Sequence, residues 1–263
     1  MKGETKSING CSIPALGLGT WNMRGSKCEK SVRKAIELGY RHIDTAVFYE
    51  NEKSVGKAID DFLRDELFIT TKVWKDKLRY EDFKRSAEGS LNRLDTNYVD
   101  LLLIHWPNEE VPIGETIKAM NELVEEGKVR YIGVSNFSQD QLNRARESSS
   151  EPIVTNQVKY HVGMDRSSLL HYCRENDLFL TAYSPLGQGE ILNRGELSNI
   201  AAKYDKSPGQ VALKWLIGQD NVLAIPKASS ESHLRENIEL FDWQLEEGDR
   251  GKLNNLVIES ENN

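Results

Sequence analysis

Short apolar runs alternate with amphipathic segments along most of this chain, and the alternation is regular enough to predict a fold. Eight runs have the length of strands: 16–21, 41–44, 67–72, 98–105, 129–134, 153–158, 179–183 and 222–226. Between them apolar residues recur at helical spacing, as at Val55, Ala58, Ile59 and Phe62. The other predicted helices run from Ser26 to Gly39, over 80–94, 113–126, from Ser138, over 166–176, 196–204, 207–219, through Leu240, and over 246–257.

The eight strand–helix units predict one domain over residues 1–263, a closed (β/α)8 or TIM barrel, with additional helices near the C-terminus. Asn9-Gly10, between two short polar-apolar segments, predicts an N-terminal β-hairpin. A doubly wound sheet is less consistent with the sequence. Gly17 and Gly19 resemble the start of a dinucleotide fingerprint, but Asn22 stands where the third glycine belongs.

Capping residues indicate where several of the helices begin. Ser26 with Glu29 predicts a capping box for the first helix. Ser207 with Gln210 predicts another, with the proline between them at the first helical position.

Composition and charge narrow the classes of function. The net charge of −7 and the pI near 5.4 argue against nucleic acid or an anionic membrane as the main partner. Cys11, Cys28 and Cys173 lack metal-ligand spacing and are expected to be free thiols. The N-terminus has no apolar signal region, and no apolar run approaches the length of a membrane span. We therefore expect a cytoplasmic protein, monomeric and without a metal.

Three of the predicted strands end in titratable residues, Asp44, Lys72 and His105, and Tyr49 follows the first of them. In a barrel, functional residues lie at the C-terminal ends of the strands. A charged lysine there needs a partner, and Asp44 is available on the neighbouring strand. The lysine is expected to lower the pKa of Tyr49, which makes the phenol a general acid. His105 can donate a hydrogen bond to a carbonyl oxygen.

Each of these residues also has an ordinary structural interpretation. Asp44 alone could cap a turn, and Tyr49 could be a half-buried aromatic residue. Lys72 could place its ammonium group in solvent at a strand end, and His105 could be a satisfied core histidine. The four together are less consistent with coincidence, because one end of one barrel would hold them all.

The chain resembles the aldo-keto reductase family. The segments DTAVFYENE, TKVW, LLLIHWP, GVSNF, NQV, YSPLG and IPK carry the resemblance, in that order. It implies a barrel that binds NADPH without a metal and transfers hydride to an aldehyde or ketone carbon. It also implies that Asp44, Tyr49, Lys72 and His105 form the catalytic tetrad, with Tyr49 protonating the oxygen. The shorter bacterial-type members, such as 2,5-diketo-D-gluconate and methylglyoxal reductases, are the most similar in pattern.

The resemblance also implies a cofactor site and a substrate pocket. Ser135, Asn136 and Gln157 match positions that hold the carboxamide, and Tyr183 matches the ring that stacks on the nicotinamide. The remaining matches are Ser184 and Leu186 along the pyrophosphate, Lys227 at the ribose phosphate, Glu236 and Asn237 at the adenine, and Thr20, Trp21, Asp44, Ser229 and His233 elsewhere in the cofactor site. Trp21, Trp74 and Trp106 should form the substrate pocket together with Tyr49 and His105.

The chain departs from the family pattern in three places. The segment NEEVPIGE after Trp106 is short, and so is the tail after the last helix, which predicts an open pocket with broad selectivity. Six residues after Lys227 the family usually has an arginine, and this chain has His233. Arg235 is two positions further, a rotation of about 200° on a helix. Histidine is only partly charged near neutral pH. We expect a modest preference for NADPH and measurable use of NADH.

Two other functions are consistent with the same residues. A barrel lysine with a lowered pKa, Lys72 or Lys227, could form a Schiff base as in an aldolase. Alternatively, the chain could be a regulatory subunit that binds NADPH with little turnover.

Overall fold

The computed structural model describes residues 4–256, and its centre is a closed barrel of eight parallel strands. The strands are β3 (Leu18–Gly19), β4 (His42–Asp44), β5 (Phe68–Val73), β6 (Val99–Ile104), β7 (Val129–Ser135), β8 (Ile153–Lys159), β9 (Phe179–Tyr183) and β10 (Val222–Ala224). Each strand pairs in parallel with the next along the chain. A parallel bridge between Leu16 and Ala224 closes the ring. The predicted (β/α)8 barrel is therefore confirmed.

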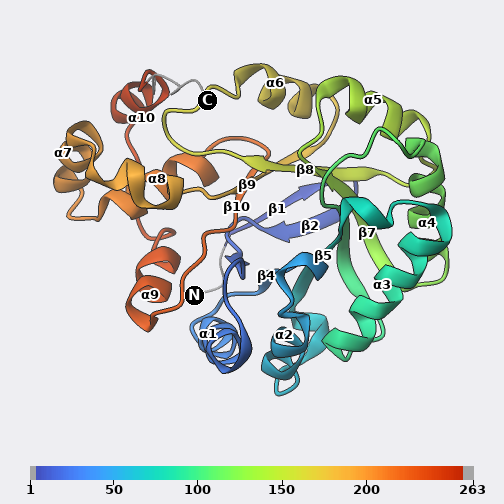
Figure 1. The fold of residues 1–263 in the computed structure, drawn as a ribbon. Coiled ribbons are helices and arrows are strands. Elements are labelled where there is room, and N and C mark those ends of the chain that lie inside the picture. The colour runs from blue at the N-terminus through green and yellow to red at the C-terminus, as the bar shows by residue number, and fades with distance from the viewer. Residues whose placement is uncertain (1–3, 257–263) are drawn as a thin grey trace.

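Helices form an outer layer around the strands (Figure 1). Eight of them connect or follow the barrel strands: α1 (Gly25–Glu37), α2 (Glu52–Ile59), α3 (Tyr80–Leu94), α4 (Ile113–Glu125), α5 (Gln139–Glu147), α6 (Ser167–Glu175), α8 (Pro208–Ile217) and α9 (Glu231–Ile238). Two more, α7 (Gly195–Lys203) between β9 and α8 and α10 (Glu247–Asn254) after α9, confirm the prediction of additional helices near the C-terminus. Short 3-10 turns include η1 (Val47–Tyr49), η2 (Arg64–Glu66), η3 (Lys75–Lys77) and η4 (Gly187–Asn193).

The predicted hairpin is present and lies at the N-terminal ends of the barrel strands. It consists of β1 (Thr5–Ile8) and β2 (Cys11–Pro14). Asn9 and Gly10 turn the chain with positive φ at both positions, as a tight two-residue hairpin requires. Lys6 Nζ donates to Gln219 O at 2.6 Å, just before β10 begins. The opposite end of the barrel is thus left for the strand-end residues.

The barrel strands are buried on both faces, which explains why their sequences are nearly continuous apolar runs. Every residue of β5 and β6 is buried. The strands approach so closely that Gly133 on β7 has no room for a side chain. A Cβ atom there would lie 2.8 Å from Leu103 Cδ2 and 2.8 Å from Thr155 Cγ2. The dense interior fixes the positions of the strand ends.

The predicted element boundaries are only partly correct. Ser207 and Gln210 form the predicted capping box. The predicted box at Ser26 is wrong, because α1 begins one residue earlier at Gly25, so that Ser26 lies inside the helix and cannot cap it. The helix predicted to include Phe62 already ends at Ile59.

The first and last predicted strands are also shorter in the structure. The first predicted strand is reduced to Leu18–Gly19, and the last ends at Ala224 before Pro226, which has no amide hydrogen to donate. The helix predicted to reach residue 257 ends at Asn254, and its last predicted position lies outside the described residues.

The three cysteines are free and buried in the core, as expected. Burial raises the pKa of each of these thiols to about 12. Across residues 4–256, no helix has the length and apolar character needed to cross a membrane. The same residues contain no group of three or more His, Cys, Asp or Glu side chains that could hold a metal ion.

Candidate active site

Three neighbouring strands bring three titratable side chains to one end of the barrel. Asp44 is the last residue of β4, Lys72 lies one residue before the end of β5, and His105 directly follows β6. His105 N donates to Val73 O at 3.0 Å, which continues the ladder between β5 and β6. Tyr49 is added from η1, which begins soon after Asp44. The strand register therefore places all four side chains in one region.

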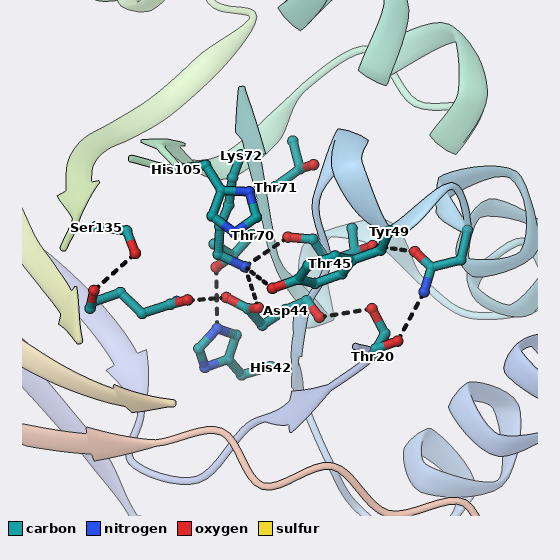
Figure 2. Close-up of polar contacts among 12 residues, drawn as sticks. Thr20, His42, Asp44, Thr45, Tyr49, Thr70, Thr71, Lys72, His105 and Ser135 are labelled. Carbon is teal, nitrogen blue, oxygen red and sulfur yellow. Dashed lines mark hydrogen bonds and ion pairs between the residues drawn. The ribbon is translucent and has the colours of Figure 1, made fainter. Parts of the chain in front are cut away.

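Lys72 is the centre of this group (Figure 2). Its side chain has no exposed surface, and its Nζ donates to Asp44 Oδ1, to Thr45 O at 2.9 Å and to the Tyr49 hydroxyl at 3.4 Å. The second carboxylate oxygen of Asp44 accepts a hydrogen bond from Gln157 Nε2 at 2.7 Å. Two buried opposite charges are thus paired and further hydrogen-bonded, which is the condition under which such a pair is tolerated.

The environment of Tyr49 changes the expectation made for its pKa. Burial raises the pKa of the phenol above its ordinary value of 10.0, and Lys72 offsets this only in part. The prediction that Lys72 lowers the pKa of Tyr49 below its ordinary value is therefore wrong, because desolvation of the phenolate outweighs the attraction of the nearby ammonium. The ammonium group can only donate, so the Tyr49 oxygen accepts from it and the phenolic hydrogen remains available for another acceptor.

In this site Lys72 is positively charged and His105 is neutral. Burial acts to lower the pKa of Lys72, but Asp44 and Tyr49 raise it above the ordinary value, so the lysine is an ammonium ion. Burial and the charge of Lys72 lower the pKa of His105 to about 3, so its imidazole is neutral. A neutral histidine carries one N–H donor, which suits it to hydrogen-bond a neutral carbonyl oxygen.

A cleft of about 660 Å³ opens onto Asp44, Tyr49 and His105. Its aromatic wall contains the predicted Trp21, Trp74 and Trp106 together with Phe48, which the sequence reasoning missed. Phe48 stacks on Trp74 with ring centres 4.0 Å apart and on Trp21 at 6.1 Å. Its position directly before Tyr49 was the one signal in the sequence.

The polar wall of the cleft consists of the three residues predicted to bind the carboxamide and of Tyr183, predicted to stack on the nicotinamide. Tyr183 Oη donates to Asn136 Oδ1 at 3.0 Å, and Asn136 Nδ2 donates to Ser135 Oγ at 3.0 Å and to His105 O at 3.1 Å. Ser135 Oγ in turn donates to Gln157 O at 2.8 Å. All four side chains line the cleft and are held in place relative to His105.

The predicted phosphate residues lie further along the same cleft. Ser184, Leu186, Lys227 and His233 all line it. Arg235 pairs instead with Glu231, with Nη2 2.6 Å from Oε1, and does not line the cleft. The Ser230 hydroxyl accepts from His233 N at 3.3 Å and thereby caps α9.

Four predicted cofactor residues do not line the cleft, and their assignment stays a prediction. Thr20 is buried, and its Oγ1 donates to Asp44 O at 3.0 Å. Glu236 accepts a hydrogen bond from the Ser207 hydroxyl. Asn237 is buried in α9, and Ser229 precedes that helix.

Sequence reasoning also missed further lining residues: Gly19, Asn22, Pro185, Gln188, Gly189, Leu192, Ile225 and Pro226. Several of them belong to the segment after β9. This segment has positive φ at Ser184, Gly187, Gln188 and Gly189. Its glycines were the available signal of an unusual backbone near the site.

Comparisons with known proteins agree with this geometry. The model of the aldo/keto reductase family matches residues 15–258. Glyoxal reductase of Bacillus subtilis (strain 168) is 39% identical over 259 residues, which cover 97% of this chain and 93% of that protein. Methylglyoxal reductase DkgB of Escherichia coli O157:H7 is 37% identical, with 91% of each chain covered. A solved aldo-keto reductase complexed with NADPH superposes with a TM-score of 0.91 at 32% identity, covering 97% of this chain and 88% of that one.

Proposed function

This chain belongs to the aldo/keto reductase family, and from that premise we propose that it reduces small aldehydes, ketones and dicarbonyls to alcohols with NADPH, with Tyr49 as the proton donor. The observation that carries the proposal is the buried Asp44–Lys72 pair in contact with the half-buried Tyr49, with Tyr49 and a neutral His105 lining one cleft. The similarity to glyoxal and methylglyoxal reductases supports small dicarbonyls as the first substrates to test.

The residues of the cleft fit NADPH. The amide side chains of Asn136 and Gln157 match the chemistry of a carboxamide, and the half-buried Tyr183 offers a flat ring. The exposed Lys227, which lines the same cleft, offers a cation to a phosphate. When bound, the cofactor supplies a hydride to the carbonyl carbon. The residues that would hold this cofactor line one cleft of a single barrel, so the proposed binding needs no separate dinucleotide-binding domain.

The protein residues act on the carbonyl oxygen. His105 donates a hydrogen bond to this oxygen and holds it in the cleft, and Tyr49 transfers its phenolic proton to it. Once Tyr49 has given up its proton, a negatively charged phenolate remains in the site. The Lys72 ammonium stabilises this phenolate, and Asp44 keeps the ammonium in place.

No observation favours a Schiff-base aldolase. Such an enzyme needs a neutral lysine with a lowered pKa that can reach the substrate. Lys72 has no exposed surface and has a raised pKa, which is the opposite of that requirement. A regulatory subunit with little turnover remains as the alternative that the activity assay decides. The cytoplasmic location and the monomeric state also stay predictions.

The proposed function predicts a substrate profile. The panel is glyoxal, methylglyoxal, aromatic aldehydes and keto-sugars, each with NADPH. We expect NADPH oxidation to be faster with the small dicarbonyls and the aldehydes than with the keto-sugars. The loss of NADPH absorbance and identification of the alcohol product measure it. Tight NADPH binding without oxidation across the whole panel would instead support the regulatory subunit.

A second prediction concerns the choice between NADPH and NADH. His233 is exposed and lines the end of the cleft where Lys227 lies. An arginine there would add a permanent charge and a planar donor pair for the 2′-phosphate. We expect His233→Arg to tighten NADPH binding by roughly 1–2 kcal/mol, with little effect on NADH.

Dissociation constants for both cofactors at two pH values measure this effect. His171→Arg, the same change at an exposed position on α6, is the matched control and should leave both constants unaltered. Equal NADPH affinity of wild type and His233→Arg at both pH values would show that this position does not contact the phosphate.

A further inference from the structure

Asn51 lies where the loop after β4 enters α2, and its side chain is 1% exposed and does not line the cleft. Asparagine at this position of a helix commonly accepts a hydrogen bond from the first turn. The side chain of Asn51 makes no such bond. The amides of Ser54 and Val55 donate instead to its main-chain oxygen, at 2.9 and 3.0 Å. The Asn51 side chain therefore has a role other than helix capping.

That side chain connects two loops of the active site. Its Oδ1 accepts from Thr45 Oγ1 at 2.6 Å, and its Nδ2 donates to Thr20 O and Met23 O, each at 2.9 Å. Thr45 directly follows Asp44, whereas Thr20 and Met23 flank the loop that carries Trp21. Both of its amide hydrogens are therefore used, in a region without solvent contact, where lost hydrogen bonds are costly.

The bond between Thr45 and Asn51 closes the base of the loop that carries Tyr49. Within this loop Tyr49 N donates to Ala46 O at 3.0 Å, and Glu50 has a left-handed backbone with φ of 55°. Lys72 Nζ contacts both ends of the arrangement, Thr45 O at 2.9 Å and the Tyr49 hydroxyl at 3.4 Å. A shift of Asn51 relative to Thr45 would therefore change the distance between the phenol and the ammonium.

We propose that Asn51 is a positioning residue, which sets the separation of the Tyr49 hydroxyl from Lys72 and holds Trp21 against the Tyr49 ring. The two rings meet edge to face with centres 5.1 Å apart. The naming of Tyr49 as proton donor rests on the proposed function, whereas the geometric role of Asn51 does not. Misplacement of a reacting group by about 1 Å can lower a rate 10²-fold.

Two variants and a matched control test this role. Asn51→Ala removes all three bonds, and Thr45→Val removes one of them while keeping the side-chain volume. Thr116→Val is the control for the second, because Thr116 is equally buried and its Oγ1 also donates one 2.6 Å hydrogen bond, to Leu78 O. That bond joins α4 to the segment before α3 and involves neither Asn51 nor the loop that carries Tyr49.

We expect kcat to fall about tenfold in Thr45→Val and about 10²-fold in Asn51→Ala. The Kd for NADPH should stay within about twofold of wild type in both, and Thr116→Val should keep kcat within about twofold. Thermal unfolding of all three variants shows whether Thr45→Val and the control lose comparable stability. A fall in kcat that is equal in Thr45→Val and Thr116→Val, or absent from Thr45→Val, would overturn the proposal.

A crystal structure of Thr45→Val gives a measure that does not depend on activity. We expect the Tyr49 hydroxyl to be displaced from Lys72 Nζ relative to the wild-type structure solved in the same way. An unmoved Tyr49 would overturn the positioning role. A displaced Tyr49 would support that role even if the wild-type protein reduced no carbonyl compound, in which case the proposed function would fail alone.

Discussion

Tyr49→Phe should lose carbonyl reduction while keeping the fold and the affinity for NADPH. The phenolic oxygen accepts one hydrogen bond, from Lys72 at 3.4 Å, and the ring packs against Trp21 and His105. A phenylalanine ring preserves that packing but carries no proton. General acid catalysis contributes on the order of 10² to 10⁴ in rate, so we expect kcat to fall by about that factor.

The measurements are kcat on methylglyoxal, Kd for NADPH and thermal unfolding. Tyr131→Phe is the matched control, because its hydroxyl also makes one hydrogen bond, to Gly10 O at 3.0 Å, at the opposite end of the barrel. The control should keep wild-type kcat. If Tyr49→Phe also keeps wild-type kcat, another group supplies the proton.

Lys72→Met should reduce both activity and stability. It removes the ammonium that stabilises the Tyr49 phenolate and leaves the Asp44 carboxylate, which is 1% exposed, with the hydrogen bond from Gln157 but no opposite charge. Breaking a buried pair in this way costs about 3–5 kcal/mol of stability. We expect kcat to fall on the order of 10²-fold or more.

The pH dependence of reduction should also change. In the wild type, the raised pKa of Tyr49 keeps the acid form present through neutral pH, so kcat should be flat there and fall only at high pH as the phenol ionises. Without Lys72 the pKa should rise further, because Lys72 is the group that lowers it. The high-pH fall in the residual activity of Lys72→Met should therefore move to higher pH. A variant that keeps wild-type kcat and an unchanged pH profile would contradict the coupling of these two residues.

A double variant separates the two effects of Lys72. In Lys72→Met with Asp44→Asn, the unpaired buried charge is gone, so much of the lost stability should return. The ammonium is still absent, so kcat should stay low. Thermal unfolding and kcat measured on the same samples make this comparison. Recovery of both would mean that Lys72 acts on activity only through the folded structure.

The fold and the centre of the site could be predicted because their signals are local in the sequence. Each apolar run predicts a strand. A polar residue at the C-terminal end of such a run is therefore expected at the C-terminal end of the barrel. Asp44, Lys72 and His105 lie within one residue of the ends of three consecutive strands and were found for this reason. The predicted pairing of Lys72 with Asp44 followed from the cost of leaving either charge buried alone.

The features that were missed depend on distances between segments far apart in the chain. The pKa of Tyr49 is raised mainly by burial of the phenol, and the sequence shows the charges nearby but not the depth of that burial. Phe48 was missed because an aromatic residue in a loop has no periodic signal. The role of Asn51 gave no sequence signal, since its partners Thr20 and Met23 precede it by more than 25 residues.

The complete burial of Lys72 and Asp44 has a consequence for how descendants of this sequence can change. Loss of either charge alone leaves the other unpaired in the interior, so selection for a folded chain retains both even after catalysis is no longer needed. Tyr49 is under no such constraint, because phenylalanine fits the same space. Among diverged copies of this barrel, retention of the lysine and the aspartate therefore indicates common descent, whereas retention of the tyrosine indicates that catalysis is still selected.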